Sequence, residues 1–309
     1  MTKRQLGRTD LSFEPLVFGG NVFGWTLEEA ETFKVLDAFL DAGFAAIDTA
    51  DSYGKGKSET ILGNWMKARG NRARVVVMTK VASEMASPEE KGLSARWITA
   101  EVENSLRRLQ TDHIDLYQSH RPDPETPQAE TLEVYDRLVK AGKVRWIGAS
   151  NFSAEQHAEA EALSIGKGWT RYESEQPEYN LYARDRFEGS LQDFCIANQI
   201  GVIPYFSLAA GFLTGKYRSE ADFGQSPRGA RMGRYLDDKG LRILAAMDKV
   251  AAETGAKLAE IALAWLNAQP GVTAAIASAT SLEQLASLAK GVRLELSPAQ
   301  LEALTAAGR

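Results

Sequence analysis

The chain has 309 residues, of which 44% are hydrophobic and 25% are charged, and its formal net charge is -5. These values are ordinary for a globular protein, and the balance lacks the basic footprint of a nucleic-acid-binding protein. The single cysteine, Cys195, excludes an internal disulfide and fits a reducing compartment. The N-terminus has no apolar signal segment and no apolar run approaches about 18 residues, so the chain is predicted to be cytoplasmic, with no membrane partner.

The first half of the chain alternates short apolar runs with amphipathic segments. Residues 4–14 predict a β-hairpin around a Gly-Arg-Thr-Asp turn, and residues 15–20 predict a buried strand. Thr26 and Glu29 have capping-box spacing, which predicts that the first helix begins there and ends at Gly43. A later helix is expected to have Pro127 at its first position. The other strands are expected at 44–47, 75–79, 114–117 and 144–149, and the other helices at 59–69, 97–109 and from Ser153.

The second half continues this alternation. Strands are expected at 171–176, 201–205 and 272–277, and helices at 188–198, 241–254, 258–268, after Ser281 and from Ser297. Residues 208–237 are too long for a plain connection in a compact domain, which predicts a functional lid after the seventh strand.

Eight strands, each followed by a helix, predict a single (β/α)8 barrel over residues 1–309, with the hairpin closing its bottom. The alternative is a doubly wound open sheet, which normally carries G-x-G-x-x-G after an early strand. Gly19-Gly20 is not that fingerprint.

In such a barrel the active site forms at the C-terminal ends of the strands. Successive strand ends carry an acid, an amine and an imidazole, at Asp48, Lys80 and His120. Each has a plainer interpretation, as a helix cap, the first solvated residue of a loop and a surface histidine. Together they converge on one mouth, which packing alone does not favour. Later strand ends add Ser150, Asn151, Gln176 and Tyr205.

The loop after Asp48 brings in a phenol, Tyr53, in the pattern Asp-x-x-x-x-Tyr-Gly. With Lys80 and His120, this pattern resembles the catalytic tetrad of the aldo-keto reductases. The resemblance extends along the whole chain and is similar in spacing to the bacterial and potassium-channel-β-like branch, which has a lid-like segment after strand seven. Its other motifs are Gly-Arg-Thr-Asp in the hairpin, Arg-Trp-Ile-Gly-Ala-Ser-Asn-Phe at 145–152, Gln-Pro-Glu-Tyr-Asn at 176–180 and Leu-Thr-Gly-Lys-Tyr at 213–217.

The chemistry explains why these four residue types belong together. Carbonyl reduction needs a hydride for the carbon and a proton for the oxygen, and no side chain supplies a hydride. The resemblance implies that Tyr53 is the general acid and that Lys80 pulls its pKa, normally about 10, toward the working range. Asp48 would keep Lys80 charged, and His120 would donate a hydrogen bond to the carbonyl oxygen. The predicted function is reversible NAD(P)H-dependent reduction of aldehydes and ketones to alcohols.

The resemblance also implies a nicotinamide dinucleotide lying across the barrel mouth, with NADPH predicted and NADH as the alternative. Ser150, Asn151 and Gln176 would bind the carboxamide, and Tyr205 would stack on the nicotinamide ring. The other implied cofactor contacts are Gly20, Asn21, Asp48, Phe206, Ser207, Leu208, Ala210, Gly211, Lys216, Ser278, Thr280 and Gln284. A small-molecule substrate is expected to meet Phe23, Trp25, Tyr53, His120 and Arg121. No metal site is predicted.

Two departures from the family pattern bear on the coenzyme. After strand seven the chain reads Tyr-Phe-Ser-Leu at 205–208, where the family usually has Tyr-Ser-Pro-Leu. At the adenosine end, Thr280 stands where an arginine commonly pairs with the 2′-phosphate, and threonine cannot make that bidentate charged contact. NADH is therefore an alternative unless a lid cation replaces the arginine. The candidate lid cations are Lys216, Arg218, Arg228 and Arg231. Gln284 also has capping-box spacing with Ser281, so a role as a helix cap is the alternative to a cofactor contact.

Three other functions remain open from the sequence. A class I aldolase would use Lys80 as a Schiff base and would not need Tyr53. A cofactor-binding regulatory subunit like channel β proteins would fit the resemblance, as would a sugar or alcohol dehydrogenase working in the oxidative direction. Aromatic side chains near the mouth suit aldehydes, quinones, sugars and steroids alike. The chain is expected to be a monomer or a weak homo-oligomer.

Overall fold

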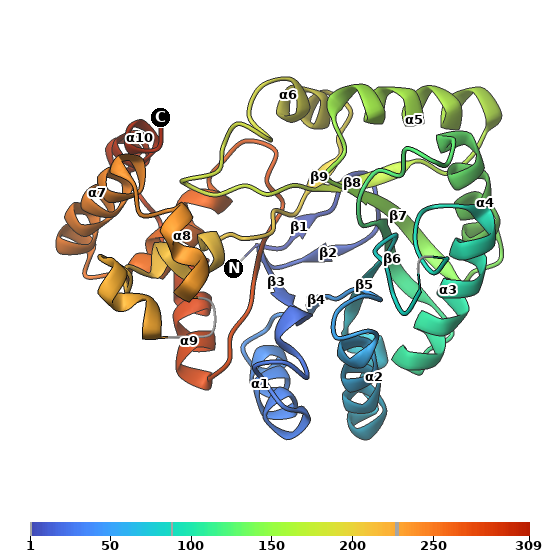
Figure 1. Ribbon diagram of the computed structural model, residues 1–309, viewed down its shortest axis with the longest axis horizontal. Helices are drawn as coiled ribbons and strands as arrows, with labels where there is room; N and C mark the ends of the chain where they lie inside the picture. Colours follow the sequence, from blue (N-terminus) through green and yellow to red (C-terminus); the bar gives the residue numbers. More distant parts are fainter. Residues whose placement is uncertain (1, 88, 226–228) are drawn as a thin grey trace.

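The computed structural model describes residues 2–87, 89–225 and 229–309, and its centre is a parallel sheet of eight strands (Figure 1). Their order is β10-β3-β4-β5-β6-β7-β8-β9, so neighbours in the chain are neighbours in the sheet. The two edges meet, because Val202 bridges Val272 and the Ile276 N–H donates to Pro204 O over 3.0 Å. The sheet thus closes into the predicted (β/α)8 barrel. The strands are β3 (Leu16–Gly19), β4 (Ala46–Asp48), β5 (Val76–Val81), β6 (Ile114–Ser119), β7 (Val144–Ser150), β8 (Tyr172–Gln176), β9 (Gly201–Val202) and β10 (Ala275–Ala277).

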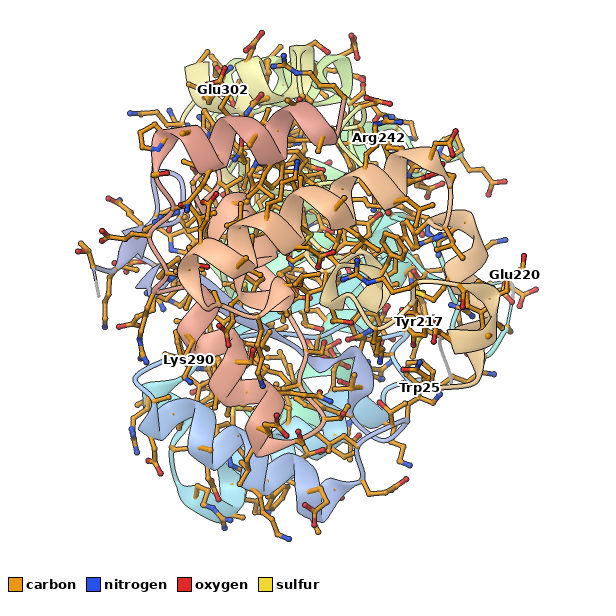
Figure 2. The ribbon with its side chains drawn as sticks, turned by 90° about the vertical axis from the view of Figure 1, so that its left-hand side faces the viewer. Trp25, Tyr217, Glu220, Arg242, Lys290 and Glu302 are labelled. Carbon is orange, nitrogen blue, oxygen red and sulfur yellow. The ribbon has the colours of Figure 1, made fainter. Side chains whose placement is uncertain are left out.

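Helices surround the strands on the outside (Figure 1). Two further helices, α7 (Asp238–Thr254) and α10 (Pro298–Ala307), lie side by side outside this ring, as Figure 2 shows around Arg242 and Glu302. Over the residues that the structure describes, no helix is long and apolar enough to cross a membrane. The helices of the ring are α1 (Glu29–Asp41), α2 (Lys57–Arg69), α3 (Ala95–Leu109), α4 (Gln128–Lys140), α5 (Ala154–Lys167), α6 (Ser190–Ala197), α8 (Leu258–Asn267) and α9 (Leu282–Gly291).

The N-terminal hairpin, β1 (Arg4–Gln5) paired with β2 (Ser12–Phe13), closes the bottom of the barrel as predicted. Leu6, Leu11 and Phe13 are buried in one cluster with inward-facing side chains of the barrel strands. This cluster fills the lower part of the barrel with apolar atoms. The polar end is therefore the opposite one, where the strands end.

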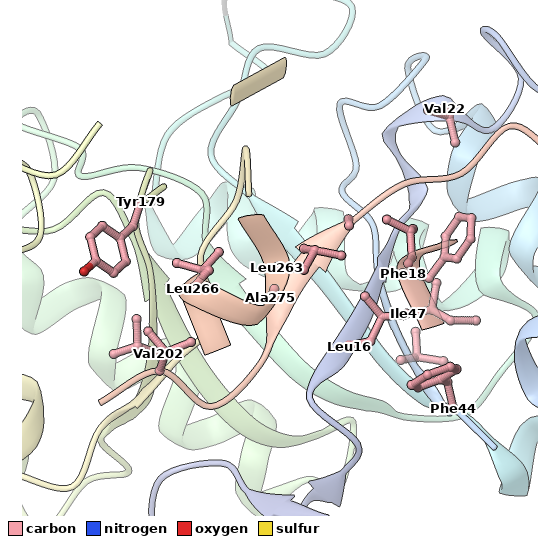
Figure 3. Close-up of a cluster of buried hydrophobic side chains, with 14 of the residues drawn as sticks. Leu16, Phe18, Val22, Phe44, Ile47, Tyr179, Val202, Leu263, Leu266 and Ala275 are labelled. Carbon is pink, nitrogen blue, oxygen red and sulfur yellow. The ribbon is translucent and has the colours of Figure 1, made fainter. Parts of the chain in front are cut away.

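A second and larger core lies between the strands and the helices. It contains Leu16, Phe18 and Ile47 from the strands, packed with helix and loop side chains such as Phe44 (Figure 3). Because side chains alternate along a strand, neighbouring residues of one strand can belong to different cores. Val17, between Leu16 and Phe18, belongs to the inner cluster.

The same alternation places polar side chains above the inner apolar layer. Met78 and Leu116 belong to the inner cluster, and two residues further along β5 and β6 come Lys80 and Gln118. Gly148 of β7 makes room for this polar layer, since a Cβ there would lie 2.1 Å from Ser174 Oγ and 3.2 Å from Gln118 Cγ. A glycine is needed here because of this close approach, not because of its backbone conformation.

Two predicted helix starts are wrong in detail. The N-cap of α1 is Glu28, without a side-chain cap, because the N–H groups of Trp25, Thr26 and Leu27 all donate to Val22 O in a preceding turn. Pro127 is the N-cap of α4 rather than its first residue. The helix starts expected at Ser153 and Ser297 are confirmed, since these residues are the N-caps of α5 and α10, each in a capping box.

The long segment after the seventh strand contains three short 3-10 helices, η3 (Ala209–Thr214), η4 (Glu220–Gln225) and η5 (Gly229–Arg234). Its base is tied to α7 by the guanidinium of Arg218, which donates to both carboxylate oxygens of Asp248 over 2.9 and 2.8 Å. This contact attaches the segment to α7.

Candidate active site

Asp48, Lys80 and Tyr53 meet at the open end of the barrel. Lys80 Nζ donates to Asp48 Oδ2 over 2.6 Å and to the carbonyl of Thr49 over 2.7 Å. It also donates to the Tyr53 hydroxyl over 3.4 Å, and it lies 4.9 Å from the centre of the Tyr53 ring. Lys80 is completely buried, so its ammonium donates to these protein oxygens instead of to water.

Two glutamine amides complete the environment of Asp48. Gln118 Nε2 and Gln176 Nε2 donate to Asp48 Oδ1 over 3.2 and 3.0 Å, and Gln176 Nε2 also lies 3.2 Å from Gln118 Oε1. Sequence reasoning missed Gln118. The signal was available, because Gln118 lies in β6 two residues before His120, and side chains two residues apart in a strand point to the same side.

The electrostatics of Lys80 and Tyr53 differ. Burial lowers the pKa of Lys80, but the nearby Asp48 carboxylate and Tyr53 outweigh this, so the pKa is raised overall. Burial raises the pKa of Tyr53, and Lys80 offsets only part of that rise. The expectation of a lowered Tyr53 pKa is therefore corrected: the cost of removing a phenolate from water exceeds the attraction of one ammonium. Tyr53 is a protonated phenol at neutral pH.

His120 faces Tyr53 across the mouth, with ring centres 5.8 Å apart in an edge-to-face arrangement. Burial, together with Lys80 and Arg121, lowers the pKa of His120 well below its usual range. The imidazole is therefore neutral at neutral pH. One of its nitrogens, Nδ1, lies 3.2 Å from Ser83 Oγ.

A cavity of 890 Å³ opens above these side chains. Its wall runs from Asp48, Tyr53 and His120, past η3, to the start of α9. Lys80 lies beneath Tyr53 and does not itself line the cavity. Predicted cofactor residues in the wall are Asn21, Asp48, Ser150, Asn151, Gln176, Tyr205, Phe206, Ser207, Leu208, Ala210, Gly211, Lys216, Ser278, Thr280 and Gln284.

The carboxamide-binding positions predicted on β7 and β8 form a connected polar group. Ser150 Oγ donates to Gln176 O over 2.7 Å, and Asn151 Nδ2 donates to His120 O over 3.2 Å. Tyr205 donates from its hydroxyl to Asn151 Oδ1 over 2.9 Å. Asn151 has a left-handed backbone (φ 63°), a conformation that asparagine tolerates better than most residues. These contacts fix the amide and the phenol on the cavity wall.

The turn after β9 follows an unusual backbone path. Phe206, Ala209 and Ala210 have positive φ values of 53°, 47° and 55°, followed by Gly211 at 108°. Ser207 is buried and donates from Oγ to Ile276 O over 2.7 Å, which ties this turn to β10. Strained, left-handed residues at a cavity wall are typical of ligand-binding turns.

The far end of the cavity lies beside α9. Gln284 accepts at Oε1 from the Thr280 N–H over 2.8 Å, while its own N–H donates to Ser281 Oγ over 3.2 Å. Ser281 thus caps α9, but the reciprocal half of the predicted capping box is missing, because the Gln284 side chain bonds the N–H of Thr280 instead of that of Ser281. Gln284 also lines the cavity. Sequence reasoning missed Lys257 and Glu283, which also line the cavity and form an ion pair of 3.1 Å. They come from separate helices, so no local pattern joins them.

Several predicted residues lie away from the cavity wall. Phe23 is buried in the hydrophobic core and stacks on Phe18 at 5.5 Å, which corrects the expectation that it meets substrate. Gly20 is also outside the wall, and a Cβ added there would lie 3.0 Å from the Phe23 ring and 3.1 Å from Asp48 O. Trp25 is 53% exposed and does not line the cavity. It lies on the same side of the molecule as Tyr217 and Glu220 (Figure 2).

The other predicted cations differ in whether they line the cavity. Arg121 does not line the cavity and donates from Nη2 to Ser83 Oγ over 2.8 Å. Lys216 does line it, whereas Arg218 pairs with Asp248 and Arg231 is exposed outside the wall. Arg228 lies outside the described residues. Within the ranges that the structure covers, no group of three or more His, Cys, Asp or Glu side chains could hold a metal ion.

Comparison with known proteins identifies the family of the chain. The model of the Aldo/keto reductase family matches residues 15–309. The chain belongs to the aldo/keto reductase family. This reductase is 37% identical to the aldo-keto reductase YhdN of Bacillus subtilis, with 88% of this chain and 81% of the relative covered.

Other relatives of this aldo/keto reductase carry different names. The uncharacterized oxidoreductase YrpG of Bacillus subtilis is 35% identical, with 94% of this chain and 91% of the relative covered. A probable voltage-gated potassium channel subunit beta of Oryza sativa is 34% identical, with 92% and 89% covered. The similarity to both bacterial and channel-β-like proteins agrees with the branch that the motifs predict.

Membership in the family makes this protein an oxidoreductase that acts on small molecules, and family members use a nicotinamide cofactor. The cavity fits such a cofactor in chemistry. The wall carries the amide groups of Asn151 and Gln176, which can bond a carboxamide, and the ammonium groups of Lys216 and Lys257, which can pair with phosphates. The donor set therefore includes both the amides and the cations that such a molecule requires.

Proposed function

We propose that this aldo/keto reductase reduces aldehyde or ketone carbonyls of small molecules to alcohols. The observation that carries the proposal is the contact of the Tyr53 hydroxyl with Lys80 Nζ, which is itself held by Asp48 at 2.6 Å, on the wall of a cavity. The nicotinamide cofactor supplies the hydride when bound. The protein must then provide a proton, orient the carbonyl and exclude water.

Tyr53 is the proposed proton donor. Its raised pKa keeps the hydroxyl protonated at neutral pH, which suits the reductive direction. As the carbonyl carbon gains a hydride, the oxygen takes the Tyr53 proton and becomes the alcohol. The phenolate left behind is stabilised by the ammonium of Lys80, so the transition state gains more from Lys80 than the ground state does. The reverse transfer oxidises an alcohol, and it is favoured at higher pH.

His120 is the proposed partner of the carbonyl oxygen. Its pKa is lowered well below the usual range, mainly by burial, so it acts as a neutral donor and not as an acid. A fixed donor aimed at the oxygen, where negative charge develops, lowers the barrier without reorganisation. Asp48 does not touch substrate in this scheme and instead positions Lys80.

The residues that would hold the cofactor form two groups. Asn151 and Gln176 would bind the carboxamide, with Tyr205 beside the ring, and the left-handed turn at Ala209 and Ala210 would follow the phosphates. Lys216 adds a positive charge on the same wall.

For the coenzyme we propose NADPH, with NADH as the alternative. Thr280 does not carry the charge that pairs with a 2′-phosphate, but Lys257 lines the same end of the cavity. Its ion pair with Glu283 at 3.1 Å is exposed, and such pairs are weak, so a phosphate can compete for the ammonium. Lys257→Met is expected to weaken NADPH binding more than NADH binding, measured by fluorescence quenching. Equal effects on both coenzymes would argue against Lys257 as the phosphate partner.

The test of the reaction is Tyr53→Phe. Coenzyme should still bind, while turnover of a reactive aldehyde falls by a factor of about 10² to 10⁴, the usual contribution of a general acid. The matched control is Tyr182→Phe, which removes a hydroxyl bonded to Asp237 away from the cavity and should keep its turnover. Wild-type turnover in Tyr53→Phe would refute the assignment.

A further inference from the structure

Ser83, in the loop after β5, contacts His120 without touching the cavity. Its side chain is largely buried, and Oγ lies 3.2 Å from His120 Nδ1. The same oxygen accepts a hydrogen bond from Arg121 Nη2 over 2.8 Å. Ser83 thus stands between a cation and the imidazole that faces the substrate.

The hydrogens at Ser83 follow from what each partner can do. A guanidinium only donates, so Ser83 Oγ must be the acceptor of the Arg121 bond. The hydroxyl hydrogen cannot point at Arg121, and among the residues that the structure describes the other polar partner of Ser83 Oγ is His120 Nδ1. A hydroxyl that accepts a charged hydrogen bond becomes a better donor itself, because bonds in a chain polarise one another. This arrangement favours donation from the Ser83 hydroxyl to Nδ1.

This direction determines where the imidazole carries its proton. A neutral imidazole has one N–H, so a ring that accepts at Nδ1 holds its hydrogen on Nε2. We propose that Ser83, oriented by Arg121, is a positioning residue that fixes His120 as the Nε2–H tautomer. The catalytic consequence rests on the proposed function, because only that tautomer presents a donor to the carbonyl oxygen.

Other contacts of His120 hold the ring but cannot choose the tautomer. Its N–H donates to Val81 O over 2.8 Å, its carbonyl accepts from Asn151 Nδ2, and its ring meets the edge of Tyr53. Backbone bonds and ring packing are indifferent to which nitrogen is protonated. Within the described residues, Ser83 supplies the polar contact to the imidazole nitrogens of His120.

The tautomer can be observed directly by long-range ¹H–¹⁵N NMR on protein labelled in histidine nitrogen. The chain has three histidines, so the spectrum is simple. His113 is partly exposed, and His157 is buried with Nε2 on Glu175, so each has a different pattern. We expect His120 to show a protonated Nε2 and an unprotonated Nδ1.

Ser83→Ala should shift the His120 tautomer equilibrium toward Nδ1–H by about tenfold, the change that one hydrogen bond of ordinary net strength produces. The kcat for a poorly reactive ketone should fall by up to about tenfold, since only the molecules in the competent tautomer turn over. Coenzyme binding should not change. Ser83→Thr keeps the hydroxyl and should restore both readouts, and Ser87→Ala, in the same loop but outside the cavity wall, should alter neither.

A protonated Nδ1 in the wild-type spectrum would overturn the proposal, and so would a Ser83→Ala variant with an unchanged tautomer. The NMR readout needs no turnover, which separates this inference from the proposed function. A Ser83-dependent tautomer in a protein that reduces no carbonyl would support the control of His120 and reject the reaction.

Discussion

Two largely buried clusters of polar and charged side chains lie on opposite sides of β5. The catalytic cluster lies inside the barrel mouth, and the helix-side cluster lies between the strands and helices α2 and α3. The catalytic cluster consists of Asp48, Tyr53, Lys80, Gln118 and Gln176. The helix-side cluster consists of Asp51, Thr79, Glu59, Glu101 and Arg108.

Strand alternation explains how the two clusters are kept apart. Lys80 and Thr79 are neighbours on β5, yet Lys80 points to Asp48 inside the barrel, while Thr79 donates to Glu59 Oε1 on α2 over 2.6 Å. Arg108 Nε in turn donates to Glu59 Oε2 over 2.6 Å. One residue along a strand thus separates a side chain of the mouth from one of the helix layer.

The clusters also differ in charge and access. In the catalytic cluster one carboxylate faces one ammonium, and Asp48 and Tyr53 line the cavity. In the helix-side cluster Glu59 and Glu101 pair with one guanidinium, Asp51 is a third carboxyl group nearby, and no member lines that cavity. Burial, with repulsion from Glu59 and Glu101, raises the pKa of Asp51 well above its usual value. Buried charge alone therefore does not mark a reaction site; contact with the cavity does.

The largest effects should come from removing the cation of each cluster. Lys80→Met should lower carbonyl reduction by a factor of about 10² or more, because the phenolate of Tyr53 loses its counter-charge. Arg108→Met should leave folded-state kcat intact but cost about 3–5 kcal/mol of unfolding free energy, because Glu59 and Glu101 lose their partner. Steady-state kinetics and urea unfolding measure the two quantities.

The two variants act as controls for each other. Lys80→Met should cost less stability than Arg108→Met, because Asp48 keeps the amide donors of Gln118 and Gln176. If the folded Arg108→Met protein lost turnover as severely as Lys80→Met, the two clusters would not be functionally separate.

A smaller effect is expected at Gln118, the residue that sequence reasoning missed. Gln118→Leu removes one donor from Asp48 and should cost about 1.5–3 kcal/mol, as for hydrogen bonds to charged groups. Turnover should fall by about tenfold, since Asp48 then holds Lys80 less firmly. Gln192→Leu, which removes a bond to the exposed Pro270 carbonyl, is the matched control and should change turnover little. An unaltered unfolding curve for Gln118→Leu would contradict the contact.

The last prediction concerns Asp51 and the pH dependence of stability. Because its folded-state pKa lies above the ordinary value of 3.8, the folded protein binds the proton more tightly than the unfolded chain. This contribution is complete below about pH 4 and is lost as the pH rises through the folded-state pKa. Asp51→Asn cannot ionise, so its stability relative to wild type should increase with pH. Unfolding midpoints at pH 4 and pH 8 test this, and a relative stability that falls with pH would refute it.

The sequence could predict the strand ends because an apolar run followed by a polar residue has a local cause. Asp48 and Lys80 end such runs, and the structure brings them within 2.6 Å. Gln118 was equally accessible to a period-two argument and was overlooked. Phe23 was not, since a single aromatic residue in a glycine-rich loop can pack inward or line a pocket, and here it stacks on Phe18.

The sequence by itself determined the family, the barrel and the residue types at the strand ends, because periodicity and motif spacing are local properties of the chain. Tertiary structure alone decided which distant groups touch: Ser83 with His120, Lys257 with Glu283, and both glutamines with Asp48. It also decided the sign of the Tyr53 pKa shift. That sign depends on how completely the phenol is removed from water, and burial is a property of the folded molecule, not of the sequence around it.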